Sequence, residues 1–321
     1  GVPRPSVHDW EAVNRQVPRL VDVLPNGPRN HVTVQVYMAG GVPEVMLHLR
    51  KLGLLRTHVR TVTGETLDTV LDWWESSARR ATVRAMLTTR DGIDADDVIM
   101  TPTQAQARGL TSTVTFPQGN LAPQGSVIKS TAIDARVVDA DGVYRKIGPA
   151  KVFLRERDAV RAIKGQSDRQ VVPGDIIVLI CGGPMGTGME ETYQVTSALK
   201  HISWGREVAV ITDARFSGVS TGACIGHVGP EALAGGPIGK IRDGDMIEII
   251  VDRNTLVGHV NLVGENHVVG TRADGDSILQ ARELRPDLCA HPLLPDDTRL
   301  WAALQHASGG TWGGCVYDVD Q

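Results

Sequence analysis

Two glycine-rich segments contain the residues of this chain that are best suited to chemistry. The first follows the apolar run DIIVLIC, reads GGPMGTGMEE and ends with Glu190 and Glu191. The second follows EVAVITDA, reads RFSGVST and contains Ser217. Glycine lets the backbone approach a ligand closely, and the first turn of a helix directs unpaired N–H groups at an anion. The two segments therefore predict loops that hold an anion beside a carboxylate pair and a serine.

Both kinds of side chain also have an ordinary structural interpretation. Acidic residues such as Glu190 and Glu191 are favoured in the first turn of a helix by the helix dipole, and a serine before a glycine is common in turns. The functional interpretation is a site for a hard cation, since Mg²⁺ binds one or two carboxylates together with substrate oxygens. A nearby dication or helix N-terminus could also stabilise Ser217 as an alkoxide base.

A rival motif overlaps the serine segment. Residues from Gly218 to Gly222 match G-x-S-x-G, the nucleophile elbow of serine hydrolases, with Ser220 as the nucleophile. An elbow should follow its strand directly, but ITDARF lies between. Asp252 and His267 follow in the order a triad needs, although such a pair arises easily by chance in a chain with 10 histidines.

Other polar residues leave both interpretations open. The loop at 119–126 is either a β-turn or a source of backbone contacts to a polar ligand, and Lys129 beyond it is either solvated or a ligand contact. His227 is expected to be packed or to cap a turn. The four cysteines lie far apart, without zinc spacing or an iron–sulfur ligand set, and are expected as reduced thiols: Cys181, Cys224, Cys289 and Cys315.

The elements that must position these residues change in character along the chain. Residues 10–85 read as mainly helical, with helices expected at 39–55 and 63–80, the second capped by Thr63 or Thr66. From about 91 to 270 the chain consists of short β-like runs separated by Gly, Pro and Asp, with a hairpin turn at 141–142. Short helices are expected at 156–165, 191–200, 221–234 and 277–285. The pattern favours a closed or mixed β-barrel with helices on it.

Composition excludes several classes of function. The net charge of −4 and the aromatic content of 4% disfavour a nucleic-acid partner. No apolar run approaches the length of a membrane span, and the first residues do not read as a signal peptide. We therefore expect a cytoplasmic protein without a membrane partner. The first residues resemble the interior of a longer chain or a processed end.

Taken together, the motifs resemble the C-terminal half of the dihydroxy-acid and sugar-acid dehydratases. The resemblance lies in GNLAPQGSVIK, VVPGDIIVL, GPMGTGMEE, VAVITDARFSG and GHVGPEALAGGPIGKIRDGD, and runs over nearly the whole chain. Upstream, VPRLVDVLPNGP and AGGVPEVM are similar to the end of that family's N-terminal domain. DWWESSARR and the tail from Leu294 resemble the D-xylonate dehydratase branch.

The resemblance implies an α+β fold and a reaction. A mostly helical end of the N-terminal, cluster-binding domain would span 1–90, a mixed β-barrel-like domain with flanking helices 91–270, and a C-terminal helix and docking tail 271–321. A sugar acid such as D-xylonate would lose water to give a 2-keto-3-deoxy acid, with Mg²⁺ and a [2Fe–2S] cluster as Lewis acids. The matching residues are Ser217 as the base and Glu191 as a Mg²⁺ ligand. Substrate contacts are expected from Gly186, Thr187, Gly188, Gly218, Ser220 and Thr221.

The sequence departs from the family in one important respect. The family's cluster cysteines, its modified lysine and its other Mg²⁺ ligands would precede residue 1, and the four cysteines here do not match the cluster positions. The N-terminal half or a companion chain is therefore expected as a partner, in a homodimer or homotetramer. Two alternatives remain: a detached, non-catalytic domain for assembly or small-acid binding, and a serine hydrolase using Ser220.

Overall fold

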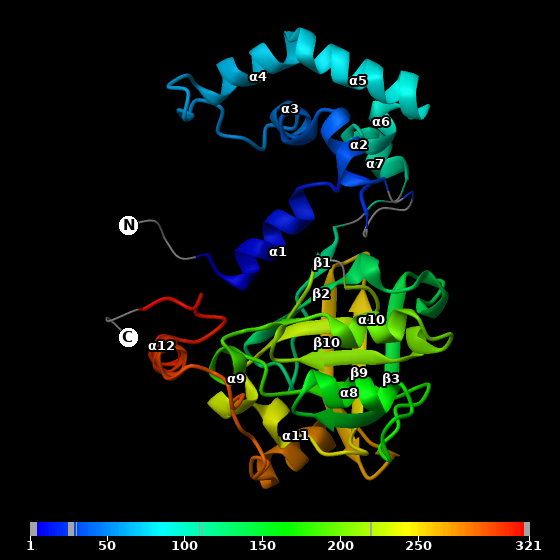
Figure 1. The fold of residues 1–321 in the computed structure, drawn as a ribbon, viewed down its shortest axis with the longest axis vertical. Helices are drawn as coiled ribbons and strands as arrows, with labels where there is room; N and C mark the ends of the chain where they lie inside the picture. Colours follow the sequence, from blue (N-terminus) through cyan, green and yellow to red (C-terminus); the bar gives the residue numbers. More distant parts are fainter. Residues whose placement is uncertain are drawn as a thin grey trace. The chain divides into compact units, whose positions relative to one another are not determined.

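The computed structural model describes residues 5–24, 29, 31–108, 110, 112–218 and 220–317. The chain divides into two compact units, Gly1–Thr113 and Val114–Gln321. The first unit is helical, and Figure 1 shows its elements in blue to blue-green. Its helices are α1 (Val7–Gln16), α2 (Thr33–Met38), α3 (Gly41–Lys51), α4 (Leu67–Ser76), α5 (Ala78–Asp91), α6 (Ala95–Val98) and α7 (Pro102–Ala107). The β-like character expected from residue 91 thus begins only after two further short helices.

A buried acid joins the helices of the first unit. Glu44 on α3 is 2% exposed and accepts two hydrogen bonds of 2.7 Å from Arg80 and one of 3.3 Å from the Trp74 indole. Arg80 lies on α5 and Trp74 on α4, so one carboxylate connects three helices. Its pKa is lowered even though burial opposes the charge, because Arg80 and Arg84 stabilise the carboxylate.

The helix expected at 63–80 is interrupted at a serine. Thr66 caps α4 by accepting from the Thr69 N–H, as one of the two predicted caps. Ser77 then adopts an extended conformation, donates from its hydroxyl to the Trp74 carbonyl and caps α5 by accepting from the Arg80 N–H. A serine side chain competes in this way with the helical hydrogen bonds, so the single predicted helix is two.

The second unit contains a nine-stranded sheet, a two-stranded sheet and five α-helices among its described residues. Its strands are β1 (Val114–Thr115), β2 (Gly125–Lys129), β3 (Val143–Phe153), β4 (Ile176–Leu179), β5 (Glu191–Thr192), β6 (Ala209–Thr212), β7 (Arg215–Phe216), β8 (Cys224–Gly229), β9 (Met246–Asp252), β10 (Val257–Glu265) and β11 (Val268–Val269). Its α-helices of more than one turn are α8 (Glu156–Ile163), α10 (Gln194–Lys200), α11 (Arg272–Ala281) and α12 (Asp296–Ala307), and α9 (Pro184–Thr187) is a single turn.

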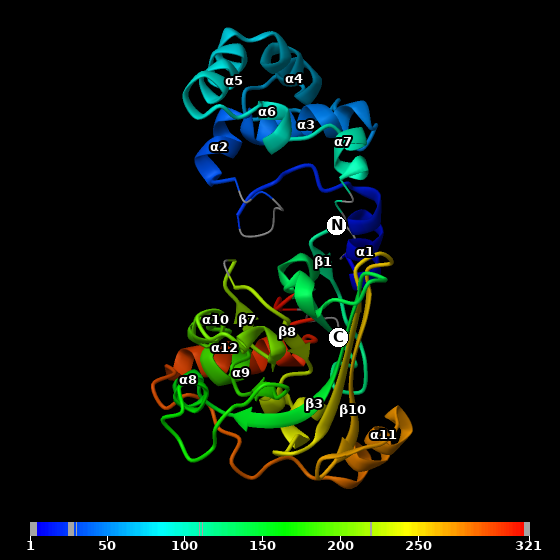
Figure 2. The ribbon, with the colours of Figure 1, turned by 90° about the vertical axis from the view of Figure 1, so that its right-hand side faces the viewer.

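Nine of the described strands form one curled sheet, in the order β1-β2-β8-β6-β4-β3-β9-β10-β11. The strands β3, β4, β6 and β8 run parallel, and the other pairs are antiparallel. The segment between β1 and β2 then meets β10, because Gln118 donates to Gly258 and accepts from Val260, both at 3.1 Å. This contact brings the two ends of the sheet together and confirms a mixed, barrel-like α+β domain; Figure 2 shows its curvature along β3 and β10.

The two faces of the central strands face different cores. Along β4, Ile176 and Val178 join the large apolar cluster enclosed by the sheet, whereas Ile177 and Leu179 join a second cluster beneath α8 and α10. Strands buried on both faces read as continuous apolar runs, which is why DIIVLI and EVAVIT were recognisable as strands. Tight turns precede β4 and β9, in which the Asp175 and Asp245 N–H groups each bond to the carbonyl three residues earlier.

Two further local expectations are wrong. The segment 221–234 forms strand β8 and a short 3₁₀ turn instead of a helix, since three glycines between 222 and 229 disfavour a helix and the strand completes the pairing with β2 and β6. The turn at 141–142 exists, with the Gly142 N–H bonded to Asp139, but residues 135–137 before it are 3₁₀ rather than a hairpin strand. No helix of the described residues is long and apolar enough to cross a membrane.

Candidate active site

The glycine-rich loops follow β4 and β6, which lie side by side and parallel. Parallel strands end at the same edge of a sheet, where ligand sites of such sheets are commonly built. Asp213, directly after β6, is 1% exposed and accepts from the N–H groups of Cys181 at 3.2 Å, Gly182 at 2.9 Å and Ala232 at 2.9 Å. Burial raises its pKa, and the backbone donors oppose that rise. Asp213 therefore ties the start of the first loop to the second.

A second buried acid holds the middle of the first loop. Glu231 accepts from the Met185 N–H with both carboxylate oxygens, at 3.0 and 3.1 Å, at the start of α9. Burial raises the pKa of Glu231 to about 8. A Cβ on Gly183 would lie 2.3 Å from the Glu231 Oε2, so this position needs glycine. Sequence reasoning missed Asp213 and Glu231; the available signal was an acid placed among small, apolar residues at a strand end.

The predicted contact residues of the first loop shape its backbone. A Cβ on Gly186 would lie 2.1 Å from the Cys181 carbonyl, and the Gly186 carbonyl accepts from the His291 N–H at 2.7 Å. The Thr187 hydroxyl donates to Gly182 at 2.8 Å and accepts from the Glu190 N–H at 2.9 Å. Gly188 ends α9 with a φ of +71°. The structure explains these three residue types by local geometry, and their contact with substrate stays a prediction.

Glu191 and Ser217 are brought together by a small, separate sheet. Gly188 and Met189 both have positive φ and end α9, so Glu191 enters strand β5 rather than the expected helix. Strand β5 pairs in parallel with β7, opposing Glu191 to Arg215, and the Ser217 N–H then donates to the Thr192 carbonyl at 3.3 Å. The exposed Glu191 carboxylate and Ser217 thus lie on neighbouring segments, although the two residues are far apart in the chain.

Ser217 lines a cavity of about 120 Å³ between the serine loop (residues 217–222) and strands β2 and β8. The lining includes Gly218, Ser220, Lys129 and His227. The Lys129 Nζ donates to the Gly218 carbonyl at 2.5 Å. Burial lowers the pKa of Lys129, and burial together with Arg215 lowers that of His227. Polar groups from β2, β8 and the serine loop therefore converge on one small space.

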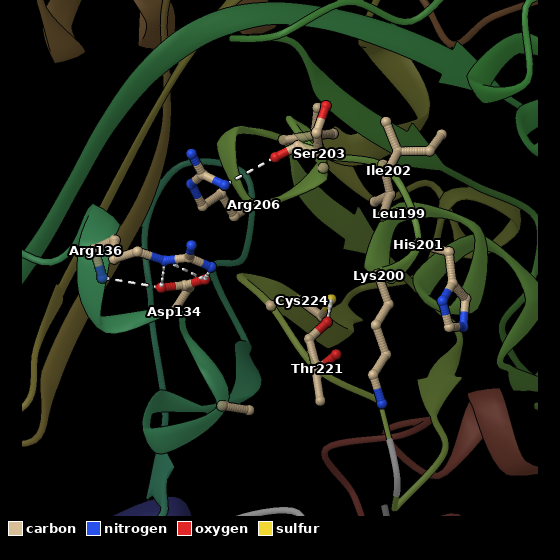
Figure 3. Close-up of a pocket in the computed structure, with 14 residues that line it drawn as sticks. Asp134, Arg136, Leu199, Lys200, His201, Ile202, Ser203, Arg206, Thr221 and Cys224 are labelled. Atoms are coloured by element: carbon tan, nitrogen blue, oxygen red, sulfur yellow. Dashed lines mark hydrogen bonds and ion pairs between the residues drawn. The ribbon is translucent and has the colours of Figure 1, made fainter.

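A larger cavity, of about 740 Å³, adjoins the first and shares Ala132, Gly222 and Cys224 with it. Figure 3 shows Thr221 at its wall, with Arg136 paired to Asp134 across from it and Arg206 donating to the Ser203 carbonyl. The structure thus places Thr221 in this cavity, whereas Ser217, Gly218 and Ser220 line the smaller one.

The geometry of Ser220 does not favour a hydrolase nucleophile. Ser220 is 3% exposed, and its hydroxyl accepts from the Thr196 hydroxyl at 3.1 Å. Asp252 accepts from Thr255 and Asn254 in the turn after β9, and His267 lies in the turn after β10. Asp252 and His267, which follow Ser220 in the order that a triad needs, therefore lie at turns in the antiparallel part of the sheet.

The cysteines do not form a ligand set. Burial raises the pKa of Cys181 and of Cys224 to about 12, which opposes the thiolate that a metal requires. Across the described residues, no three His, Cys, Asp or Glu side chains gather in a way that could hold a metal ion. Glu191 is therefore at most one ligand of a shared site, and an iron–sulfur cluster does not fit the cysteines of this chain.

Comparison with known proteins agrees with these features. The dihydroxy-acid/6-phosphogluconate dehydratase C-terminal model matches residues 97–280, and the N-terminal model of the same family matches residues 4–70. Two D-xylonate dehydratases of Escherichia coli K12, YagF and YjhG, are 62% and 60% identical over 99% of this chain and 48% of their own length. A dihydroxy-acid dehydratase of a Mycobacterium species is 37% identical over 78% of this chain and 38% of its own.

The identity to the E. coli proteins extends through both compact units, and the C-terminal match covers both loops and the strands that position them. The chain spans about half of the length of these curated relatives. The chain belongs to the dihydroxy-acid/6-phosphogluconate dehydratase family.

Proposed function

We propose that this chain is the part of a sugar-acid dehydratase that carries the serine base and one magnesium ligand. The two E. coli relatives are D-xylonate dehydratases, which supports D-xylonate, or a sugar acid of the same class, as the substrate. The observation that carries the proposal is the pairing of β5 with β7, which sets Glu191 and Ser217 on neighbouring segments at the edge where β4 and β6 end.

The exposed Glu191 carboxylate fits a Mg²⁺ ion, which binds one or two carboxylates and takes its remaining ligands from substrate and water. Bound Mg²⁺ would neutralise the charge of the acid's carboxylate and so make the adjacent C2–H easier to remove. The cysteines of this chain do not fit an iron–sulfur cluster. The remaining Mg²⁺ ligands and any cluster ligands are expected from the N-terminal half or a companion chain.

The residues of this chain would act on the C2 proton. Ser217 Oγ, as the alkoxide, would take the proton from C2 of a 2,3-dihydroxy acid. The C3–O bond would break as the C2=C3 double bond forms, and the departing hydroxyl would take a proton from the Ser217 hydroxyl, so that water leaves and the alkoxide is restored. The resulting enol tautomerises to the 2-keto-3-deoxy acid. The hydrogen bond from the Ser217 N–H to Thr192 holds the serine beside the strand that carries Glu191, which supports this division of roles.

The test uses the complete enzyme that contains this chain, assayed with D-xylonate for formation of the 2-keto-3-deoxy acid. We expect Ser217→Ala to lower kcat by at least about 10³-fold, and Glu191→Gln to weaken Mg²⁺ activation strongly. The neighbouring Glu190→Gln and the exposed Ser277→Ala on α11 serve as matched controls and should keep near-normal turnover. Near-normal kcat for Ser217→Ala would overturn the proposal.

The same measurements separate the alternative functions. A domain that only binds small acids would bind D-xylonate without turnover in the complete assembly. A serine hydrolase would lose its activity in Ser220→Ala and react at Ser220 with a fluorophosphonate. The Ser220 hydroxyl is buried and hydrogen-bonded, which disfavours both hydrolysis and fluorophosphonate labelling at that residue.

A further inference from the structure

Lys129 connects a strand of the barrel to the serine loop. It is the last residue of β2, is partly buried, and donates from Nζ to the Gly218 carbonyl at 2.5 Å. The two residues are 89 positions apart in sequence. A lysine ammonium has three donors, and this hydrogen bond uses one. The contact therefore holds the residue next to Ser217 and also places a positive charge at the wall of the serine cavity.

No carboxylate of the described residues forms an ion pair with this lysine, and the lining of the serine cavity contains none. Lys146 on β3 offers a direct comparison. It is also partly buried and donates to a backbone carbonyl, that of Glu207, at 2.7 Å. The acids Asp175 and Glu207 stabilise its charge, whereas the group that favours the charge of Lys129 is the Cys224 thiol and not an acid. Burying a charge without a counter-ion costs free energy. A lysine kept in such a place is therefore a candidate for a functional role.

Among the titratable groups around the serine cavity, Lys129 carries the principal charge. His227 and Cys224 project from β8, and burial favours the neutral form of each. Arg215 lies on β7 with an exposed side chain, and Glu191 lies opposite it on β5. A cation beside a group that must become negative favours its ionised form. Ser217 is such a group if it acts as the base.

We propose that Lys129 is a positioning residue of the serine site, holding the loop through Gly218 and supplying the positive charge that favours the Ser217 alkoxide. The inference rests on the proposed function, because it assigns a role to Lys129 only through Ser217. It predicts that the charge of residue 129, and not merely its packing, sets the pH range over which the enzyme works.

The test compares Lys129→Met, Lys129→Arg and the matched control Lys146→Met in the complete enzyme, with D-xylonate as substrate. In Lys129→Met we expect the acid limb of the kcat/KM profile to move up by about one pH unit or more. At a pH below that limb, kcat/KM should fall at least about tenfold. Lys129→Arg should restore most of the position of the limb, and Lys146→Met should leave it unchanged. Circular dichroism and bound Mg²⁺ should match the parent enzyme.

Equal losses in Lys129→Met and Lys129→Arg with an unmoved pH profile would overturn the proposal, and so would normal activity in Lys129→Met. If Lys129→Met does not fold, Lys129→Gln is measured in the same way. The proposed function fails separately: an active Ser217→Ala enzyme would remove the serine base altogether. An inactive Ser217→Ala beside an unimpaired Lys129→Met would remove only the role of the lysine.

Discussion

The glycine loop (residues 181–188) and the serine loop (residues 217–222) are held in contrasting ways. Two buried acids, Asp213 and Glu231, accept hydrogen bonds from the backbone of the glycine loop, and its glycines touch other atoms closely. The serine loop is held through the Ser217 N–H, the Ser220 hydroxyl and the lysine contact to Gly218. A Cβ added to Gly218 would meet nothing within 4 Å. The comparison indicates that an added side-chain atom is tolerated less well at Gly186 than at Gly218.

The largest effect should come from filling the glycine loop. Gly186→Ala would place a methyl group 2.1 Å from the Cys181 carbonyl, so either loop or strand must move. We expect a loss of about 4 kcal/mol in the free energy of unfolding, measured by urea unfolding of the variant and its parent. Gly218→Ala, as the control in the other loop, should change it by less than about 0.5 kcal/mol. Similar losses in the two variants would remove the contrast.

Removal of Asp213, the acid that joins the glycine loop to Ala232, should be the next most damaging change. Asp213→Ala leaves the N–H groups of Cys181, Gly182 and Ala232 without their acceptor. Unsatisfied buried donors cost about 1–3 kcal/mol each, and water entering the cavity recovers part of this. We expect a loss of about 3 kcal/mol by the same urea measurement. A loss below about 1 kcal/mol would show that the three donors have other acceptors.

Protonation of Glu231 should make the glycine loop sensitive to pH. Its pKa is about 8 in the folded chain against an ordinary 4.5, so between these values the folded state holds a proton that the unfolded state has released. Stability should therefore fall as the pH rises through this window and level off above about 8. Glu231→Gln cannot lose this proton and should lack that part of the dependence.

The two proteins are compared by urea unfolding near pH 5 and near pH 9. We expect the parent to lose roughly 2 kcal/mol more than Glu231→Gln between these conditions, since relaxation reduces the full value of so large a shift. Asp213 titrates in both proteins, so the difference between them reports Glu231. Parallel pH dependences would contradict a proton held at this position.

The smallest effect is expected in the serine loop. Ser220→Ala removes the hydrogen bond from the Thr196 hydroxyl, which is a single neutral interaction. We expect a cost of about 1 kcal/mol in urea unfolding and little change in kcat for D-xylonate. Thr196→Val is the companion variant and should cost more, because it also removes the hydrogen bond from the Thr196 hydroxyl to the Tyr193 carbonyl. A loss of turnover comparable to that of Ser217→Ala would place Ser220 in the chemistry.

The sequence alone was sufficient for features that depend on neighbouring residues. The strands β4, β6, β9 and β10 are apolar runs after turn signals, and α3 follows its helical spacing, so local pattern and final structure agree. Segment 221–234 was misjudged because its small apolar residues suit either a helix or a strand, and only pairing with β2 and β6 decides between them. Glu191 was expected in a helix because the positive φ of Met189 was not visible in its residue type.

In the candidate site, too, some features could be predicted from the sequence and others could not. Ser217 and Glu191 could be singled out by residue type and family resemblance, and the fold explains how they meet. The contacts from Asp213 to Ala232 and from Lys129 to Gly218 connect segments that no periodic pattern relates. Such pairings are decided by the closure of the barrel, so sequence reasoning could name their residues but not their partners.

The contact between Gln118 and β10 affects the order in which the second unit can fold. The two ends of the sheet can meet only when residues 258–260 are available to pair with residue 118. In the same way, β2 can pair only when β8 is available. Folds dominated by such distant pairings form slowly, because loop closure precedes the contacts that reward it. On the ribosome, the serine loop can therefore acquire its final surroundings only after β10 has emerged, and a chain released before Glu265 would leave both loops without a finished barrel beneath them.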